Sequence, residues 1–288
     1  MLTELVDVKS FDWSTLPSCG FFEVLGKRGT GKTTWTQFIL QSSPNRDTGV
    51  FVVVAGSETA KHSWSKIVHP VFVVDPSLKH LEMLKTTQNE LVRHYQKIGE
   101  PFPPERQVTL VFDDVSSNKE LMRSHILAYL ASNSRHLQMS IFILAQYHCQ
   151  IVSEVRNQFD IVFTLSTADK RSIDRIYSEY CSCLDARVFR HILGTVTQNF
   201  GLLVINNQSN SNKIDDICFY SHMKPYPPEL QALGGQQTWD FGRDHYCDQD
   251  NARPDVTDAE EWQETRDRDE KTNHVINDRK GCIVIRMS

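Results

Sequence analysis

Short apolar runs alternate along this chain with longer stretches in which apolar residues return every three or four positions. The short runs predict buried β-strands, and the longer stretches predict amphipathic helices. Their alternation is typical of βαβ units built around a mostly parallel sheet. We therefore predict an α/β fold with a central, mostly parallel sheet flanked by helices. The expected strands are residues 21–25, 50–55, 71–74, 108–112, 141–145, 161–165, 200–205 and 217–220.

The longest helical pattern covers residues 78–98. Within it, Leu84, Leu91 and Tyr95 follow one another at spacings of seven and four, which places them on one face of a helix. Pro101 belongs to a group of prolines that ends the pattern. Further helices are expected at residues 32–41, 118–133, 170–180 and 185–193.

The pattern changes after residue 222. Prolines at 225–228 predict an extended linker, and the paired glycines at 234–235 predict flexible coil. Beyond them the chain is rich in charge and poor in apolar periodicity, which favours disorder or a loosely attached segment. The apolar residues 282–287 fit either an edge strand or a disordered end. The expected segments are an N-terminal extension (1–17), a main domain (18–222), a linker (223–239) and an acidic C-terminal tail (240–288).

The composition of the 288 residues is that of a globular protein. With 40% hydrophobic and 23% charged residues, a collagenous or wholly disordered chain is excluded. The net charge is −5, so the whole chain lacks the basic signature of a nucleic-acid-binding protein. The acidity is local, however, because residues 240–271 hold twelve acidic and five basic residues, whereas residues 1–239 hold 23 of each. The charge of the main domain therefore does not exclude a nucleic acid partner.

Cysteine spacing and the N-terminus bear on the compartment. Seven cysteines at irregular spacing do not resemble the disulfide framework of a secreted domain, so we expect free thiols. The N-terminal residues include acids and lack an apolar core, which does not fit a signal peptide. The longest apolar runs are far shorter than the roughly 20 residues that a membrane-spanning helix needs. These features predict an intracellular, soluble protein without a membrane segment.

The segment from Gly26 to Thr33, GKRGTGKT, matches the phosphate-loop pattern G-x-x-x-x-G-K-[ST] in full. Glycines let backbone N–H groups turn toward phosphates, and the following helix N-terminus adds positive potential. In such a loop Lys32 reaches the β- and γ-phosphates, and the Thr33 hydroxyl binds Mg²⁺. A strand is expected before the loop and a helix after it, so the sequence predicts a nucleoside triphosphate site. The residues expected to bind the nucleotide are Gly26, Lys27, Arg28, Gly29, Thr30, Gly31, Lys32, Thr33 and Thr34.

A second signal stands at the end of the expected strand 108–112, which Asp113 and Asp114 follow directly. P-loop NTPases hold Mg²⁺ with a carboxylate at such a strand end, and a second carboxylate can act as general base toward water. We assign Asp113 to the metal and Asp114 to the attacking water. The adjacent carboxylates favour a hydrolytic motor over a GTPase switch.

The strand expected at 141–145 is followed by Gln146, whose amide would orient water or sense the loss of the γ-phosphate. Arg156 and Arg135 are the arginines nearest these motifs. Each fits either a finger presented to the nucleotide of a neighbouring subunit or an ordinary surface salt bridge. The expected catalytic residues are Lys32, Asp114, Gln146 and Arg156.

Taken together, these motifs resemble the DNA-packaging ATPases of nucleocytoplasmic large DNA viruses, the poxvirus-type packaging family. That family is similar in turn to the FtsK–HerA group of P-loop NTPases. The resemblance covers about residues 18–222 and rests on the ordered set of motifs, because a phosphate loop alone indicates only the superfamily. The matching segments are GKRGTGKT, VFDDV and residues 134–137, 145–147, 155–157 and 199–206.

The resemblance implies ATP and Mg²⁺ as cofactors, with Lys32 and Thr33 at the nucleotide, Asp113 and Asp114 as the acidic pair, and Gln146 as the sensor. It also implies a homo-oligomeric ring that moves double-stranded DNA without sequence preference. The implied activity is packaging of viral genomic DNA into the virion, with a capsid or other virion protein as a possible partner. The implied place is the cytoplasm or nucleus of the host cell, at virion assembly sites. The tail inherits nothing from the resemblance.

Other readings of the same residues stay open. Another P-loop DNA motor or helicase would carry the same motifs, and a nucleotide kinase would add an arginine-rich lid, of which the sequence shows no clear example. A non-enzymatic protein with a residual nucleotide site does not fit the intact lysine, threonine and aspartates. Lys170, Arg171 and Arg175 form a basic cluster that fits either DNA contact or a solvated helix face.

Overall fold

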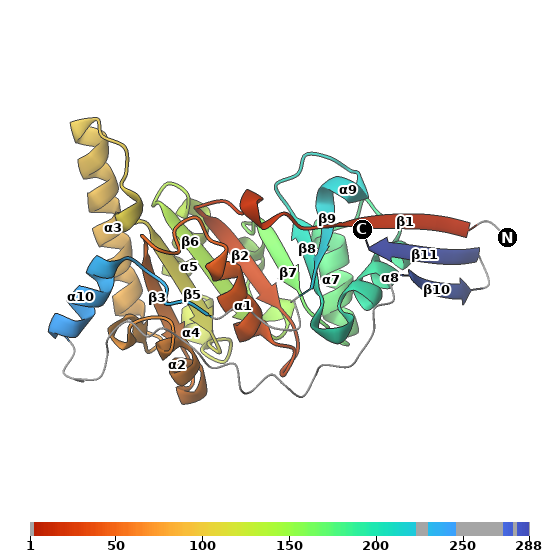
Figure 1. Ribbon diagram of the computed structural model, residues 1–288, viewed down its shortest axis with the longest axis horizontal. Helices are drawn as coiled ribbons and strands as arrows, with labels where there is room; N and C mark the ends of the chain where they lie inside the picture. The colour runs from red at the N-terminus through yellow and green to blue at the C-terminus, as the bar shows by residue number, and fades with distance from the viewer. Residues whose placement is uncertain (1–2, 223–229, 246–272, 279–280, 288) are drawn as a thin grey trace.

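The computed structural model describes residues 3–222, 230–245, 273–278 and 281–287. In this part of the chain, eleven strands form one sheet in the order β10-β11-β1-β9-β8-β7-β2-β6-β5-β3-β4. Figure 1 shows this sheet running along the length of the molecule. The strands are β1 (Thr3–Ser10), β2 (Gly20–Leu25), β3 (Val50–Ala55), β4 (Val73–Val74), β5 (Val108–Asp113), β6 (Met139–Ala145), β7 (Ile161–Thr164), β8 (Leu202–Asn206), β9 (Cys218–Ser221), β10 (Asn273–Asp278) and β11 (Gly281–Met287).

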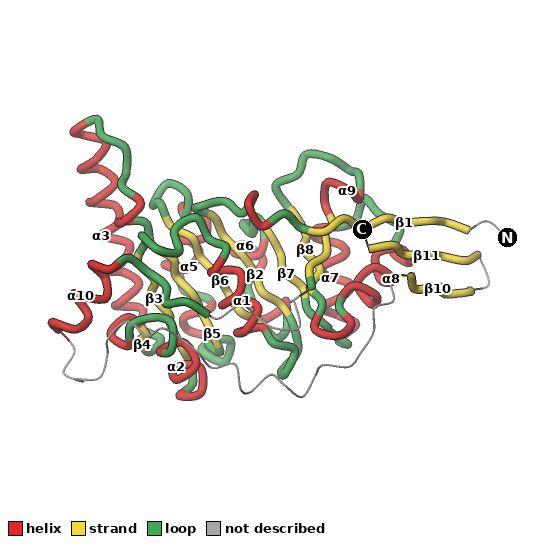
Figure 2. Tube along the Cα trace, viewed as in Figure 1, coloured by secondary structure: helices red, strands yellow, loops and turns green. Residues whose placement is uncertain are grey.

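Helices connect most of these strands, as the tube in Figure 2 shows. Within the described residues, no helix is both long enough and apolar enough to cross a membrane. The α-helices are α1 (Lys32–Gln41), α2 (Glu58–Ser65), α3 (Leu78–Ile98), α4 (Lys119–Met122), α5 (His125–Asn133), α6 (Ser153–Arg156), α7 (Lys170–Tyr180), α8 (Ala186–Val196), α9 (Ile214–Ile217) and α10 (Gln236–His245).

The centre of the sheet is parallel. The strands β7, β2, β6, β5, β3 and β4 all pair in parallel, and β8 and β9 add two antiparallel pairs beside β7. The carboxyl ends of parallel strands meet at one edge of a sheet, where α/β proteins bind ligands. The loops that follow β2, β5 and β6 therefore come together at this edge. The predicted α/β fold with a mostly parallel sheet is confirmed.

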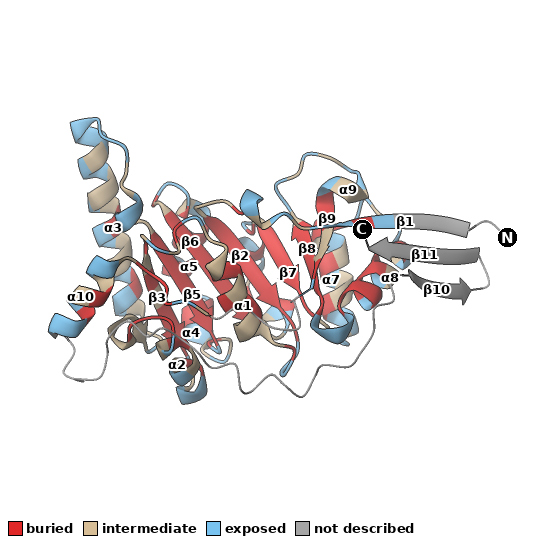
Figure 3. Cartoon of the chain, in the orientation of Figure 1, coloured by how far each residue is buried: buried red, intermediate tan, exposed pale blue. Residues whose placement is uncertain are grey.

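Two hydrophobic cores cover the two faces of the sheet, because side chains alternate along each strand. On β2, Phe21 and Leu25 join the core beneath α5, α7 and α8, whereas Phe22 and Val24 join the core beneath α1 and α2. Figure 3 shows the central strands as the most continuously buried part of the molecule. A strand buried on both faces explains why these segments read as unbroken apolar runs.

Two predicted elements differ from the structure for local reasons. The helix expected at 118–133 is interrupted after α4, because the Ser124 hydroxyl accepts a hydrogen bond from the N–H of Leu127 (3.2 Å) and so caps a new helix, α5. The strand expected at 71–74 is shortened to β4, because Pro70 begins a 3₁₀ turn, η2 (Pro70–Phe72). The ends of α1, α3 and α7 agree with the prediction.

Both ends of the chain contribute strands to the same side of the sheet. Strand β1, within the expected N-terminal extension, pairs in parallel with β9 and with β11. Strand β10 pairs with the other edge of β11. Of the two alternatives for residues 282–287, the structure shows a strand. Most of the expected acidic tail, residues 246–272, lies outside the described residues.

The segment 230–245 packs on the body of the protein. The N–H of Leu233 donates to the carbonyl of Ile67 (2.7 Å), and the side chain of Trp239 is buried at 1% exposure. The prediction of flexible coil around residues 234–235 is therefore wrong. The burial of Leu233 and Trp239 offsets the entropy cost of ordering this segment. The expected boundaries of the linker and the other segments stay a prediction.

Candidate nucleotide-binding site

The phosphate loop joins the carboxyl end of β2 to the N-terminus of α1, as the sequence predicts. Gly29 and Gly31 have φ angles of +79° and +84°, a left-handed backbone that glycine adopts without strain. Gly31 is also the residue that precedes α1, so the turn aims the first N–H groups of the helix at the loop. The hydroxyl of Thr30 donates to the carbonyl of Lys27 (2.8 Å) and closes the turn.

Lys32 lies across the mouth of this loop. Its ammonium group donates hydrogen bonds to the carbonyls of Gly26 (2.8 Å) and Lys27 (3.2 Å). Burial lowers the pKa of Lys32, and the nearby carboxylates of Asp113 and Asp114 act in the opposite direction. The fold therefore holds a partly desolvated positive charge at the position where the phosphates of a nucleotide would lie.

The two residues predicted to bind metal lie in direct contact. The Thr33 hydroxyl donates to Oδ2 of Asp113 at 2.8 Å, although 80 positions separate them in the sequence. Asp113 is only 4% exposed, and burial raises its pKa against the hydrogen bonds that it accepts. A hydroxyl and a carboxylate are the hard oxygen ligands that suit Mg²⁺. This donor pair fits the metal predicted from the sequence, which Thr33 and Asp113 would hold.

A tryptophan completes the surroundings of Asp113. The indole N–H of Trp64 donates to the same oxygen, Oδ2, at 2.8 Å, and both groups are buried. Trp64 lies on α2, a helix that the sequence patterns do not predict. Its signal in the sequence is weak: a buried tryptophan needs a hydrogen-bond acceptor, but nothing near Trp64 in the chain indicates which one.

Asp114 stands at a sharp turn after β5. Its side chain is exposed and its φ is +55°, which aspartate tolerates better than most residues. The turn presses against Gly56, the residue after β3, so closely that a Cβ at Gly56 would lie 2.0 Å from the Asp114 carbonyl oxygen. Only glycine fits there. Gly56 therefore lets Asp113 point inward while Asp114 faces the solvent beside the loop.

Gln146 follows β6, the strand that lies between the phosphate-loop strand β2 and the acidic strand β5. It is half-buried and stands at the same sheet edge as the phosphate loop and Asp113. This is the edge where a γ-phosphate sensor belongs. The sensor role itself stays a prediction.

The structure places Arg156 differently from the sequence expectation. Arg156 is only 6% exposed, and its guanidinium donates to both carboxylate oxygens of Glu179 (2.9–3.2 Å) and to the carbonyl of Ile151. An arginine finger must reach out to the nucleotide of another subunit. A side chain held inside its own subunit by these bonds does not, so the finger role expected for Arg156 is not supported by its position.

Arg135 is the more accessible of the two arginines. Its side chain is 57% exposed and pairs with Asp160, whose other oxygen accepts the N–H of Phe21 (2.8 Å). Arg135 precedes β6, so it stands at the sheet edge opposite the phosphate loop. That position keeps Arg135 away from the phosphate loop of its own chain, and a finger role for Arg135 stays a prediction.

Arg156 belongs to a buried polar network that the sequence analysis missed. Glu23, in the middle of β2, bonds to Nδ1 of His148 at 2.8 Å, and Nε2 of His148 bonds to Glu179 at 2.8 Å. Glu23 and His148 are both 0% exposed. The signal for this network is visible in the sequence: a glutamate inside the apolar run Phe21–Leu25 must find a partner when the strand is buried.

The pKa values of His148 and Glu23 are shifted inside this network. Burial alone would lower the pKa of His148, but Glu23 and Glu179 outweigh it and raise the pKa above its usual 6.5. Burial raises the pKa of Glu23, and His148 opposes that shift. The hydroxyl of Tyr180 donates to the carbonyl of Arg156 (2.9 Å), which closes the network from α7.

We expect His148→Gln to change how stability depends on pH. Because the pKa of His148 is higher in the folded protein than its usual 6.5, protonated His148 stabilises the fold fully at pH values below 6.5. This stabilisation is lost as the pH rises through the pKa of the folded state. Between these values, the free energy of unfolding contributed by His148 falls by at most about 1.4 kcal/mol per pH unit. Thermal unfolding of wild type and His148→Gln at pH 6 to 9 checks this. Two parallel curves would contradict it.

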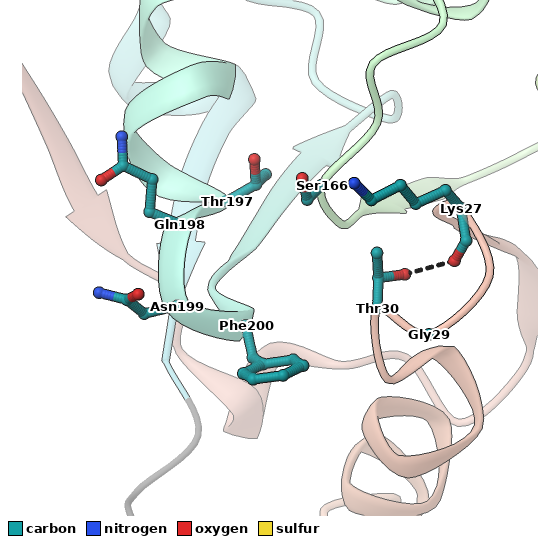
Figure 4. A pocket seen from close by; sticks show the side chains of 8 residues that line it. All are labelled: Lys27, Gly29, Thr30, Ser166, Thr197, Gln198, Asn199 and Phe200. Atoms are coloured by element: carbon teal, nitrogen blue, oxygen red, sulfur yellow. Dashed lines mark hydrogen bonds between the residues drawn. The ribbon is translucent and has the colours of Figure 1, made fainter. Parts of the chain in front are cut away.

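A pocket of ≈ 390 Å³ opens beside the phosphate loop (Figure 4). Lys27, Gly29 and Thr30 form one wall, and residues 197–200 form the facing wall, with Ser166 between them. The facing wall contains the 3₁₀ turn η5 (Gln198–Phe200), which connects α8 to β8. This turn is not among the residues that the motifs predict for the site.

The chain is similar to proteins of two viruses. It is 23% identical over 222 residues to the uncharacterized protein 015R of frog virus 3 (isolate Goorha), covering 76% of this chain and 66% of that protein. It is also 23% identical over 225 residues to the uncharacterized protein 075L of invertebrate iridescent virus 6, covering 77% and 84%. The chain thus spans just under two thirds of the frog virus 3 relative.

Two solved structures are similar to this chain. One is the pCW3 conjugation coupling protein TcpA, monomer form with ATPgS, with a TM-score of 0.50 and 13% identity, covering 69% of this chain and 59% of that one. The other is the genome packaging NTPase B204 from Sulfolobus turreted icosahedral virus 2 in complex with ATP-gammaS. It has a TM-score of 0.49 and 12% identity, covering 72% and 98%. The likeness to TcpA agrees with a P-loop NTPase fold.

A protein-family model matches most of the chain. The model, described as Poxvirus A32 protein, matches residues 8–224. This range includes the phosphate loop, the acidic strand end and Gln146, so the match confirms the resemblance inferred from the motifs. The chain belongs to the Poxvirus A32 protein family.

Proposed function

We propose that this chain is an ATP-hydrolysing motor that translocates double-stranded DNA to package a viral genome into the virion. The observation that carries the proposal is the contact between Thr33 and Asp113 at 2.8 Å, with Lys32 and Asp114 beside it. These four residues are the parts that phosphoryl transfer to water requires. Membership of the Poxvirus A32 protein family supports the packaging role.

Each residue has a distinct part in hydrolysis. Lys32 binds the β- and γ-phosphates, and Thr33 and Asp113 hold Mg²⁺. When bound, the ion neutralises the negative charge that develops on the phosphate oxygens. Asp114, exposed beside the loop, accepts the proton of the attacking water. Gln146 follows β6, the strand between β2 and β5, and senses the γ-phosphate.

The motor acts as a homo-oligomeric ring on the DNA backbone, with a capsid or other virion protein as its partner at the assembly site. Phosphate contacts carry no sequence information and add up over the subunits, so the neutral body of each subunit is compatible with DNA binding. Lys170 and Arg171 on α7 are exposed, as is Arg175 one turn further along the same helix. These three are our candidates for contacts to DNA.

Asp114→Asn tests hydrolysis and translocation together. We expect double-stranded DNA of any sequence to raise the ATPase rate of the wild type. Asp114→Asn should lower kcat by about 10²–10⁴-fold, because it removes the general base, while the affinity for ATP is kept. Steady-state ATPase assays with and without DNA, together with equilibrium nucleotide binding, measure both effects.

Asp216→Asn, at an exposed aspartate on α9, is the matched control and should behave as the wild type. A rate that DNA leaves unchanged would rule out a DNA motor, even if ATP is hydrolysed. Phosphorylation of an added nucleoside monophosphate would instead favour the nucleotide kinase. DNA-stimulated hydrolysis with strand separation would favour a helicase.

A further inference from the structure

The pocket beside the phosphate loop has an uncharged facing wall. Ser166, Thr197, Gln198 and Asn199 offer hydroxyl and amide groups, and Phe200 adds an aromatic ring (Figure 4). Lys27, on the loop side, supplies the one charged side chain of the lining. A triphosphate would be drawn to the loop, whereas this wall suits the uncharged remainder of a nucleotide. Its volume, ≈ 390 Å³, is in the usual range of small-molecule sites.

Phe200 is the unusual member of this wall. Its side chain is 55% exposed, although phenylalanine gains most from burial. Its φ is +60°, and the preceding Asn199 has φ +49°. A bulky residue in the left-handed region is strained, and such strain gathers at ligand-binding sites. Folding alone does not explain a strained and exposed phenylalanine at this position.

The strained turn is held by the nucleotide-binding elements themselves. The indole N–H of Trp35, on α1 three residues after Lys32, donates to the Phe200 carbonyl at 2.8 Å. The N–H of Gly201 donates to the Gln198 carbonyl, also at 2.8 Å. A Cβ placed on Gly31 would lie 3.8 Å from the Phe200 ring. The backbone of the turn is therefore held against α1, and the Phe200 ring lies near the start of that helix, next to the phosphate loop.

We propose that Phe200 is the platform on which the base of ATP stacks when its phosphates occupy the loop. This inference rests on the proposed function, because it takes ATP as the ligand. Stacking of a base on an aromatic side chain contributes about 1–3 kcal/mol. A ring whose backbone is already held at the edge of the loop loses little conformational entropy when a base stacks on it. The stacking energy then offsets the strain of the turn.

Phe200→Gly separates this role from a structural one. Glycine adopts positive φ freely, so the variant should fold at least as stably as the wild type. Its affinity for a non-hydrolysable ATP analogue should nevertheless fall by roughly 5- to 150-fold, the fold-change that corresponds to the stacking energy. Its affinity for inorganic tripolyphosphate should stay unchanged, because tripolyphosphate has no base. Calorimetric titration of both ligands provides these affinities.

Two further variants sharpen the test. Phe200→Tyr keeps a ring of similar size and should keep the affinity for the analogue. Phe241→Ala removes a phenylalanine of similar exposure (49%) on α10 and should change neither affinity. If Phe200→Gly lost affinity for the analogue and for tripolyphosphate equally, the proposal would be overturned, because Phe200 would then only support the phosphate loop.

An unchanged affinity for the analogue in Phe200→Gly would overturn the proposal while leaving the ATPase function intact. Failure of the wild type to bind the analogue would instead overturn the proposed function and this inference together. A defect in DNA stimulation with normal nucleotide affinity would assign Phe200 to DNA and also overturn the proposal.

Discussion

Lys32→Ala is expected to abolish ATP hydrolysis, with kcat reduced by about 10²–10³-fold or more. The ammonium of Lys32 is held at the mouth of the loop by two backbone carbonyls, so its charge is already in place when phosphates arrive. Charge that is fixed and partly desolvated stabilises a transferring phosphoryl group far more than a mobile surface lysine would. Steady-state ATPase assays and nucleotide titration measure the loss.

The same variant should not be less stable than the wild type. Burial lowers the pKa of Lys32, which means that keeping it charged costs the folded protein free energy. Lys32→Ala should therefore unfold at the same or a higher denaturant concentration. Lys97→Ala, at an exposed lysine on α3, is the control and should change neither activity nor stability. Substantial ATPase activity in Lys32→Ala would refute the assignment of the site.

Arg156→Ala is expected to lower the free energy of unfolding by about 3 kcal/mol. The substitution leaves Glu179 and the carbonyl of Ile151 without the donor that they share, and the Glu179 side chain is only 22% exposed. Arg135→Ala should cost only about 0–1 kcal/mol, because Arg135 is exposed and Asp160 keeps its hydrogen bond from Phe21. Denaturant unfolding of the two variants measures the difference.

Mixed assemblies distinguish these residues in a second way. If Arg135 is a finger acting on a neighbour, a minority of Arg135→Ala subunits should inhibit wild-type subunits more than in proportion to their share. Arg156→Ala subunits should lower activity only in proportion to the fraction that fails to fold. The opposite pattern, with Arg156→Ala stable and strongly inhibitory, would restore the finger role of Arg156.

The parts of the site that the sequence predicted are those with local causes. Gly29 and Gly31 enable the turn on their own, and Asp113 is aligned by the strand that precedes it. The ends of α3 could be placed because Ser77 caps its start and Gly99 its end, both close in sequence to the apolar pattern.

The parts that the sequence did not predict depend on contacts between distant segments. Trp64 meets Asp113 across 49 positions. Helix α2 was missed because only Ala60 and Trp64 of its residues are buried, which leaves almost no apolar periodicity. The positive φ of Phe200 has no signal in the chain, because phenylalanine is among the residues least suited to it.

The buried network of Glu23, His148, Glu179 and Arg156 has a consequence for how this protein can change over evolution. With His148 protonated, the two negative and two positive charges cancel inside the body. Losing any one of them leaves a buried charge or donor unsatisfied, which destabilises the fold more than replacing all four with apolar residues of similar volume would. Replacing these four residues one at a time would pass through destabilised proteins. We therefore expect related proteins either to keep all four residues or to replace them together.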